Sequence, residues 1–363
     1  MAATLKTTVI QEPSSSTVNI TLDSSGNVTG GANLVATGMP YGSSSFLRNR
    51  IINGNMVIDQ RNSGASVSTT ATNTVAYTVD RFFYYVSQAS KFTVQQNAGS
   101  VTPPVGFTNY LGVTSSSAYT VGSTEQFSIS QRIEGYNISD FAWGTANAKT
   151  VTLSFWVYSS LTGTFGGAIN NISYNRTYPF IYSIGLANNW TYITITIPGD
   201  TTGTWSTNNG LGLALSFGLG CGSGTSGTAG SWGTSGAVSA TGAVSVVGTS
   251  GATFYITGVQ LEQGSVATPF ERPLYSKQLA DCQRYYFVPA TNSNALYAAN
   301  FASAAFFLMK YPVTMRVNPT VTYSYIYGSF TANYGTADIA QLYSSVLPSQ
   351  GVQLSSFTAS AEL

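Results

Sequence analysis

The sequence predicts an all-β protein: an antiparallel, jelly-roll-like β-sandwich with one short helix and a small C-terminal β-unit. Three observations favour this fold. Charged residues make up only 7% of the 363 residues, the chain holds 37 Gly and 23 Tyr, and apolar residues alternate with polar ones over many short segments. Typical soluble proteins carry about 25% charged residues. Gly, Ser, Thr and Tyr favour turns and strands over long solvated helices.

The first segment, residues 1–47, contains two short alternating stretches, 5–10 and 18–22, followed by a Gly-rich run. A segment this small cannot close a hydrophobic core alone, and the edges of its strands need a partner. We therefore expect residues 1–47 to be an anchor or linker. The sandwich is expected at 48–275, and the helix with the C-terminal β-unit at 276–363.

Strand signals become regular after Asn49, where apolar and polar side chains alternate with a period of two. The predicted strands are 51–58, 79–86, 92–95, 127–133, 151–158, 193–197, 211–219 and 253–261. No helical pattern interrupts them. Half-buried strands in this number predict two packed antiparallel sheets.

The remaining segments surround a single helix. Residues 220–251 are nearly all Gly, Ser, Thr and Ala, which predicts a long loop or loose hairpin without a core of its own. Ser276 is a candidate helix cap, because Leu279, Cys282 and Tyr286 follow at helical spacing. After Pro289 the period returns to two over 307–311 and 317–327, which predicts the C-terminal β-unit.

Composition excludes several classes of function. The formal net charge is +1, with no basic cluster, so the footprint of a nucleic-acid-binding protein is absent. The longest apolar stretch, about 298–309, is shorter than the roughly 20 residues of a membrane-spanning helix. The first residues lack the pattern of a secretory signal. We expect neither nucleic acid nor membrane insertion, and weak surface charge favours self-association.

Metal and nucleophile chemistry has few candidate residues. The chain contains no His, which removes the commonest general base and transition-metal ligand. Cys221 and Cys282 are the two cysteines, 61 positions apart, and we predict that both are free thiols. No cofactor and no metal site are predicted. A structural calcium ion held by carbonyl oxygens would leave no motif in the sequence.

Three stretches of the chain together resemble a domain of bacteriophage tail-fibre and related virion appendage proteins. The first is NRIINGNM at 49–56, with DQR at 59–61 and YTVDRF at 77–82. The second is GVQLEQGSVATPFER at 258–272, with DCQRYY at 281–286. The third is YPVTMR at 311–316, with PTV at 319–321. Order and spacing agree with the family, whose members usually have Trp where Phe82 stands.

This resemblance implies a homotrimeric virion protein whose jelly-roll domain is akin to carbohydrate-binding modules. It also implies assembly in the bacterial cytoplasm and a place on the surface of the phage particle. Residues 4–28 are similar to short N-terminal pieces that join marine phage fibres to the particle. Other virion proteins are therefore expected partners of the N-terminal segment.

Catalytic carboxylates are predicted to be absent. Glycoside hydrolysis needs two carboxyl groups that face each other across the scissile bond. Glu262 and Glu271 lie close in sequence, but each stands among the family-like residues of 258–272, and we predict structural roles for both. Three other acidic residues have an arginine nearby in the sequence, and this spacing predicts ion pairs of Asp59 with Arg61, Asp80 with Arg81, and Asp281 with Arg284. We expect no enzyme activity.

Aromatic residues are the candidate binding groups, because sugars stack their C–H faces on aromatic rings. Four fall in loop-like tracts and are predicted to contact glycan: Tyr174, Tyr178, Trp205 and Trp232. The alternative is that they hold glycine-rich backbone in place. Trp156 and Tyr158 face away from the aliphatic row of their strand, which predicts contact between subunits.

The sequence therefore favours a non-catalytic tail-fibre or appendage protein that mediates receptor binding and host adsorption through surface glycans. One alternative is a capsid or neck decoration protein that stabilises the particle. A third hypothesis is a polysaccharide depolymerase. The composition and motifs of the chain are compatible with either of the first two roles.

Overall fold

A computed structural model describes residues 48–289, 296–297, 299–301, 304–327, 329–330, 332–344 and 353–363, together with three short strands before residue 48. Its contacts divide the chain into two units, Met1–Leu47 and Arg48–Leu363. The first unit contains a three-stranded antiparallel sheet. Its strands are β1 (Val9–Ile10), β2 (Ile20–Leu22) and β3 (Val28–Gly30). The rest of the predicted anchor, 1–47, lies outside the described residues.

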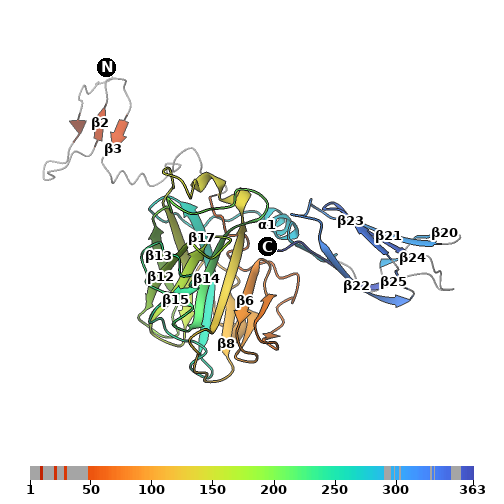
Figure 1. The fold of residues 1–363 in the computed structure, drawn as a ribbon, viewed down its shortest axis with the longest axis horizontal. Helices are drawn as coiled ribbons and strands as arrows, with labels where there is room; N and C mark the ends of the chain where they lie inside the picture. The colour runs from red at the N-terminus through yellow and green to blue at the C-terminus, as the bar shows by residue number, and fades with distance from the viewer. Residues whose placement is uncertain are drawn as a thin grey trace, which may run out of the picture. The chain divides into compact units, whose positions relative to one another are not determined.

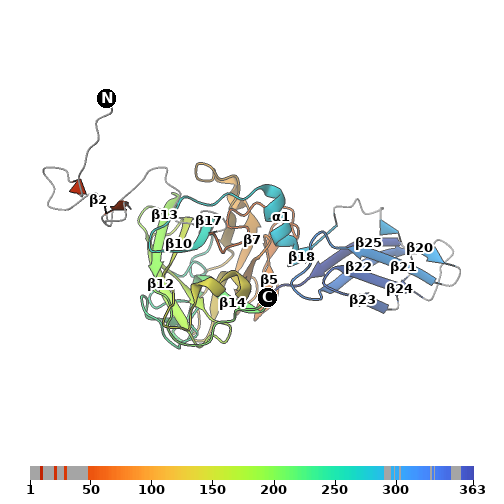
Figure 2. The same cartoon turned by 90° about the horizontal axis from the view of Figure 1, so that it is seen from above.

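Two six-stranded antiparallel sheets form the sandwich of the second unit (Figures 1 and 2). Sheet one has the order β13-β10-β17-β8-β7-β4. Its strands are β4 (Val67–Ser68), β7 (Phe92–Gln96), β8 (Leu111–Ser115), β10 (Val151–Ser159), β13 (Thr191–Ile197) and β17 (Thr253–Gln263). Sheet two has the order β12-β11-β14-β9-β6-β5. Its strands are β5 (Thr74–Tyr77), β6 (Phe82–Val86), β9 (Gln126–Glu134), β11 (Gly163–Asn170), β12 (Thr177–Ile184) and β14 (Leu211–Cys221).

The chain crosses repeatedly from one sheet to the other, as in a jelly roll. Side chains of alternate residues meet between the sheets: the Phe155 ring of sheet one lies 5.1 Å from the rings of both Phe217 and Tyr182 of sheet two. The period-two pattern of the sequence thus corresponds to buried and outward residues. The predicted all-β, antiparallel, jelly-roll-like sandwich is confirmed.

One predicted strand, 51–58, is wrong, because this segment is a series of turns. Asn53 and Met56 have φ angles of 61° and 59°, which a strand does not contain. The Asn53 amide holds the turn by accepting a hydrogen bond from Ile58 N and donating one to Ile58 O. Ile51, Met56 and Ile58 are buried, and this burial produces the strand-like apolar pattern. Five strands of the two sheets were not predicted: β4, β5, β8, β11 and β12.

The Gly/Ser tract at 220–251 forms no separate core, in agreement with the prediction, and its Val246 and Val247 belong to the core of the sandwich. It contains β15 (Ser226–Gly227) and β16 (Ser239–Ala240), which pair in parallel, and its Val246 and Val247 are fully buried. Ser239 lies on the outer face of sheet two, where Gly166 and Gly218 have no side chains to block it. Glycine in two central strands therefore lets a further layer of backbone pack on the sheet.

This close approach can be tested at Gly218. A Cβ atom there would lie 2.4 Å from Ser239 Oγ and 2.7 Å from Ser239 Cβ. We expect Gly218→Val to lower the free energy of unfolding by about 1–3 kcal/mol and to make the tract sensitive to limited proteolysis. Gly233→Ala is the control, because a Cβ at Gly233 meets nothing within 4 Å. Equal effects of the two variants in urea unfolding would contradict this packing.

The single α-helix of the described residues, α1 (Tyr275–Gln283), confirms the predicted helix but not its cap. Leu274 occupies the N-cap position, without a side-chain hydrogen bond, and Ser276 lies inside the first turn. The buried residues of the helix are Gln278 and Cys282. Tyr286, predicted on the same helical face, instead belongs to a strand. The same described residues contain three short 3₁₀ helices: η1 (Ala98–Ser100), η2 (Gly135–Asn137) and η3 (Ser139–Phe141).

The residues after the helix form the predicted C-terminal β-unit. In one of its sheets, β25 (Gln353–Ser360) pairs with β18 (Tyr286–Phe287), β19 (Leu296–Tyr297) and β22 (Thr320–Tyr327). The other contains β20 (Ala299–Phe301), β21 (Ala304–Lys310), β24 (Ile339–Ser344) and β23 (Ala332–Gly335). Phe307, Leu342 and Phe357 are buried in a separate small core.

Candidate functional site

The segments that carry the family resemblance contact one another in the structure. Asn49 Oδ1 accepts hydrogen bonds from the backbone N–H groups of Ile51 and Leu261, and the Asn49 N–H donates to a Glu271 carboxylate oxygen at 2.8 Å. Glu262 is 1% exposed and accepts hydrogen bonds from Thr268 N and Thr268 Oγ1. Both carboxylates thus bind nearby backbone or side-chain groups of the framework.

The predicted ion pairs have the wrong partners. The observed pairs join Arg61 and Arg81 to Glu362, Arg284 to Glu134, and Lys277 to Asp281, with Arg61 also 3.8 Å from Asp80. The Asp59 carboxylate instead accepts the backbone N–H groups of Asn62 and Gly64. Residues that are adjacent in sequence point in different directions along extended chain or turns, so neighbours in sequence are poor guides to ion pairs.

Metal and thiol chemistry have no visible site in the described part of the chain. There, no three His, Cys, Asp or Glu side chains gather as metal ligands would. Cys221 and Cys282 are free thiols, and burial raises the pKa of both, that of Cys221 to about 11. Thiols with raised pKa values are poor nucleophiles. No helix among the described residues is long and apolar enough to cross a membrane.

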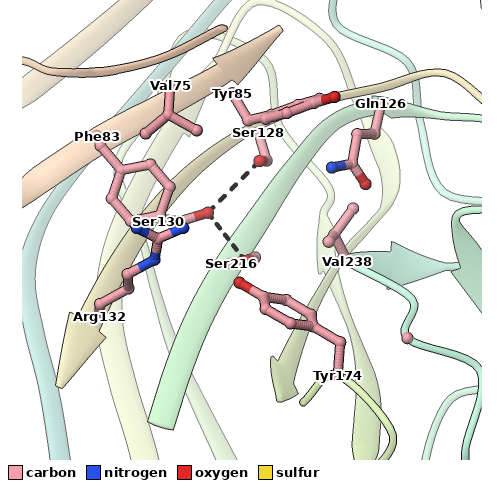
Figure 3. Close-up of a pocket in the computed structure, with 11 residues that line it drawn as sticks. Val75, Phe83, Tyr85, Gln126, Ser128, Ser130, Arg132, Tyr174, Ser216 and Val238 are labelled. Carbon is pink, nitrogen blue, oxygen red and sulfur yellow. Dashed lines mark hydrogen bonds between the residues drawn. The ribbon is translucent and has the colours of Figure 1, made fainter. Parts of the chain in front are cut away.

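A groove of 320 Å³ lies on the outer face of sheet two. Figure 3 shows Val75, Phe83 and Tyr85 on one side of it, Tyr174 and Val238 on the other, and three serines between them. Gln126, Arg132 and Gly236 complete the lining. The groove therefore combines aromatic walls with hydroxyl, amide and guanidinium groups.

The floor of the groove consists of Ser128 and Ser130 on β9 and Ser216 on β14. These residues alternate with inward-facing Phe127, Ile129 and Phe217, so the strand pleat turns the serines outward. Ser130 Oγ lies 2.9 Å from Ser216 Oγ and 3.4 Å from Ser128 Oγ (Figure 3). The groove exists because these small side chains, on two adjacent strands, lie between larger neighbours.

The first wall comes from β6 and carries a cation. Phe83 and Tyr85 are alternate residues of this strand, so both face outward. The Arg132 guanidinium lies over the Phe83 ring, 4.8 Å from its centroid, and donates a hydrogen bond to Leu363 O. Packing against an aromatic face and a carbonyl fixes this guanidinium at one end of the groove.

The opposite wall depends on a constrained tyrosine. Tyr174 has a φ angle of 52°, in the left-handed region that tyrosine rarely adopts. Asn171, which is fully buried, holds the turn: its Oδ1 accepts hydrogen bonds from the N–H groups of Asn175 and Arg176. Strained residues that persist in this way cluster at binding sites. The turn therefore presents the Tyr174 ring to the groove.

Behind this turn, Arg176 forms a two-pronged ion pair with Asp200, at 2.8 and 2.6 Å. Trp205 Nε1 also donates a hydrogen bond to Asp200 Oδ2, at 3.2 Å. Burial by itself would raise the pKa of Asp200, but the hydrogen bonds from Arg176 and Thr202 together with the Arg176 charge lower it below its ordinary value. The ionised carboxylate is thus the form that supports the turn.

This pair predicts a loss of stability in acid. Because folding lowers the pKa of Asp200, its stabilising contribution is present above about pH 4 and is lost as the pH falls through the folded pKa. We expect wild type to lose more stability than Asp200→Asn between pH 5 and pH 3, in urea unfolding followed by tryptophan fluorescence. Asp140→Asn, at a solvent-exposed ion pair with Arg50, is the control. Parallel curves for wild type and Asp200→Asn would refute the prediction.

Of the four predicted glycan contacts, the structure brings only Tyr174 to the groove. Tyr178 lies in β12 rather than in a loop and is 6% exposed, and Trp205 is 8% exposed. Trp232 packs on both of them, at 5.2 Å from the Tyr178 ring and 5.5 Å from the Trp205 ring. Its Nε1 donates to Pro198 O at 2.8 Å. These three side chains pack against one another and hold loops in place. This is the alternative role that the sequence left open for the loop aromatics.

The two residues predicted at a subunit contact differ in their surroundings on the outer face of sheet one. Tyr158 stacks on Tyr255, with ring centroids 5.2 Å apart and planes at 7°, and Trp190 packs against it. Trp156 is half-buried beside Tyr192, whose side chain is 44% exposed. The subunit contact stays a prediction.

Sequence reasoning missed Phe83, Tyr85 and the three serines of the groove. The signal was present: alternation in β9 places Ser128 and Ser130 opposite the buried Phe127 and Ile129. The sequence alone does not show that these residues lie side by side, because β6, β9 and β14 become neighbours only in the folded sheet.

No family model matches the chain, and no curated protein matches it. Several solved structures are similar in fold. The tailspike protein 4 enzymatically active domain of bacteriophage CBA120 has a TM-score of 0.29 and 11% identity, over 60% of this chain and 21% of that chain. The family 11 carbohydrate-binding module from Clostridium thermocellum, in complex with a mixed-linked tetrasaccharide, has a TM-score of 0.29 and 13% identity. The match covers 55% of this chain and 100% of that module. TmCBM61 in complex with galactotriose has a TM-score of 0.29 and 10% identity, and the match covers 60% of this chain and 99% of that chain. These scores are too low to transfer a function.

Proposed function

We propose that this chain is a non-catalytic adhesion protein of a bacteriophage appendage, and that the groove on sheet two binds glycans of the host surface. The groove itself is the observation that carries the proposal. A pyranose ring has apolar C–H faces and polar edges, which fit aromatic walls and a floor of hydroxyl groups. Tyr85 and Tyr174 supply the walls, and the serines with Gln126 and Arg132 supply hydrogen-bonding groups.

The lining of the groove favours binding without hydrolysis. Hydrolysis of a glycosidic bond needs a carboxylic acid and a carboxylate on opposite sides of the bond. None of the residues that line the groove is Asp or Glu. Glu262 and Glu271 form hydrogen bonds within the framework, away from the groove residues.

The appendage role rests on the sequence resemblance at 49–82, 258–286 and 311–321. In this proposal the chain forms a homotrimer, the N-terminal unit attaches it to other virion proteins, and the particle is assembled in the host cytoplasm. Weak binding at each groove is sufficient in such an assembly, because several linked sites raise the effective affinity by orders of magnitude.

The test uses the purified full chain and polysaccharide extracted from host cells. We expect saturable binding to immobilised polysaccharide, without release of reducing ends and without loss of viscosity. Release of reducing ends would overturn the non-catalytic role. Absence of binding, combined with loss of particle stability when the gene is deleted, would instead support a decoration protein.

A further inference from the structure

A second aromatic hollow, of 390 Å³, lies on the outer face of sheet one, the sheet opposite to the groove. Its lining includes Trp156 and Tyr192, whose ring centroids are 5.1 Å apart. It also includes Phe107 and Phe270, 5.2 Å apart, with the Arg272 guanidinium 4.6 Å from the centroid of the Phe107 ring. Two pairs of rings thus line one concave space.

A β-bulge builds this hollow. The register between β10 and β17 shifts between Ser154 and Trp156, and Gly258 adopts a φ angle of 63° at the shift. A Cβ atom on Gly258 would lie 2.7 Å from the Phe107 ring and 3.2 Å from the Trp156 ring. Only glycine lets both rings approach the strand here, and bulges commonly redirect side chains at functional sites.

Two hydroxyl side chains, Ser154 and Thr268, line the hollow. The Ser154 residue is 2% exposed. Thr268 Oγ1 donates to Glu262 at 2.6 Å and accepts a hydrogen bond from Gln260 Nε2 at 3.3 Å, so one lone pair of this oxygen remains for a further donor. The hollow therefore combines aromatic rings with hydroxyl groups that can hydrogen-bond a ligand.

The neighbouring surface argues for a small ligand rather than a second copy of the chain. Tyr110 and Tyr255 on this face are already buried, and Tyr158 stacks on Tyr255. A stable protein interface usually buries about 800 Å² per partner on a broad surface. A concave space of 390 Å³ with aromatic walls and a few polar groups is instead typical of a small-molecule site.

We infer that the hollow around Trp156 is a second saccharide-binding site. A pyranose ring lies between the ring pairs, with its hydroxyl groups toward Ser154 and Thr268. The site does not depend on the groove, because the two are on outer faces of different sheets. One chain therefore holds two saccharide segments at once, which makes each subunit bivalent.

The experiment is calorimetric titration of the full chain with tri- to hexasaccharides of glucose, galactose and mannose, for wild type, Trp156→Ala and Tyr174→Ala. We expect two sites per chain in wild type and one site in each variant, with the lost site weakened at least tenfold. Tyr192→Ala, at a 44% exposed side chain, repeats the test if Trp156→Ala fails to fold. Tyr136→Ala, at a 59% exposed side chain outside both sites, is the control and should keep both sites.

The outcomes separate this inference from the proposed function. One site that Tyr174→Ala removes and Trp156→Ala leaves intact would overturn the second site and keep the groove. One site that only Trp156→Ala removes would keep the second site and overturn the groove. Unchanged binding by Trp156→Ala with a lower mass in light scattering would overturn the inference in favour of a subunit contact. Absence of binding by wild type would overturn both.

Discussion

Arg81→Met is expected to lower the free energy of unfolding by about 3–5 kcal/mol, because it removes one partner from a buried ion pair. The Arg81 side chain is 1% exposed and binds the Glu362 carboxylate, which is 7% exposed. It also donates to Arg132 O at 2.6 Å, and its guanidinium lies 3.6 Å from the centroid of the Tyr285 ring. Arg81 belongs to the sandwich, whereas Tyr285 and Glu362 follow α1. The substitution therefore weakens the connection between the sandwich and the C-terminal β-unit.

The control for this variant is Lys277→Met. Lys277 and Asp281 form an ion pair on one face of α1, with exposed side-chain fractions of 50% and 33%. Exposed pairs of this spacing contribute about 0.3–0.5 kcal/mol. Urea unfolding should show a much larger loss for Arg81→Met than for Lys277→Met. Losses of the same size would mean that the ion pair with Glu362 does not hold the two parts together.

Glycan affinity should fall about 10- to 100-fold in either Tyr85→Ala or Tyr174→Ala. Each substitution removes an aromatic wall of the groove, and burying a large side chain against a ligand contributes about 1.5–3 kcal/mol. Neither tyrosine belongs to the fully buried core. We therefore expect the affinity to change more than the stability.

Binding of host polysaccharide to immobilised protein measures this effect, with Tyr136→Ala as the control for loss of an exposed tyrosine. Tyr136 lies in η2 and does not line the groove. Its removal should leave the affinity within about twofold of wild type. If Tyr85→Ala and Tyr174→Ala bind as well as Tyr136→Ala, the groove is not the glycan site.

The sequence predicts the sandwich well because its strands alternate strictly, as in 127–133 and 151–158. It misleads where buried apolar residues occur in turns. Ile51, Met56 and Ile58 follow a strand-like pattern, although the Asn53 side chain holds them in a loop. The sequence also does not show how 220–251 packs on the sandwich, because this packing depends on glycines of other strands, such as Gly218.

The candidate site was less predictable than the fold, and Tyr174 and Tyr178 illustrate why. They are close in sequence and of the same type, yet Tyr174 reaches the groove through a turn held by Asn171, while Tyr178 is covered within β12. Composition does not distinguish an exposed ring from a buried one. The serine floor was missed for a related reason: serines become a site only when the fold puts aromatic walls beside them.

The most direct test of glycan binding at the groove is a crystal structure of the full chain with a bound host oligosaccharide. We expect a sugar ring between Tyr85 and Tyr174, with its hydroxyl groups within hydrogen-bond distance of Ser130 or Ser216. A second sugar in the hollow beside Trp156 agrees with the further inference. An oligosaccharide bound elsewhere, with the groove on sheet two filled only by water, would show that the groove is not the glycan site.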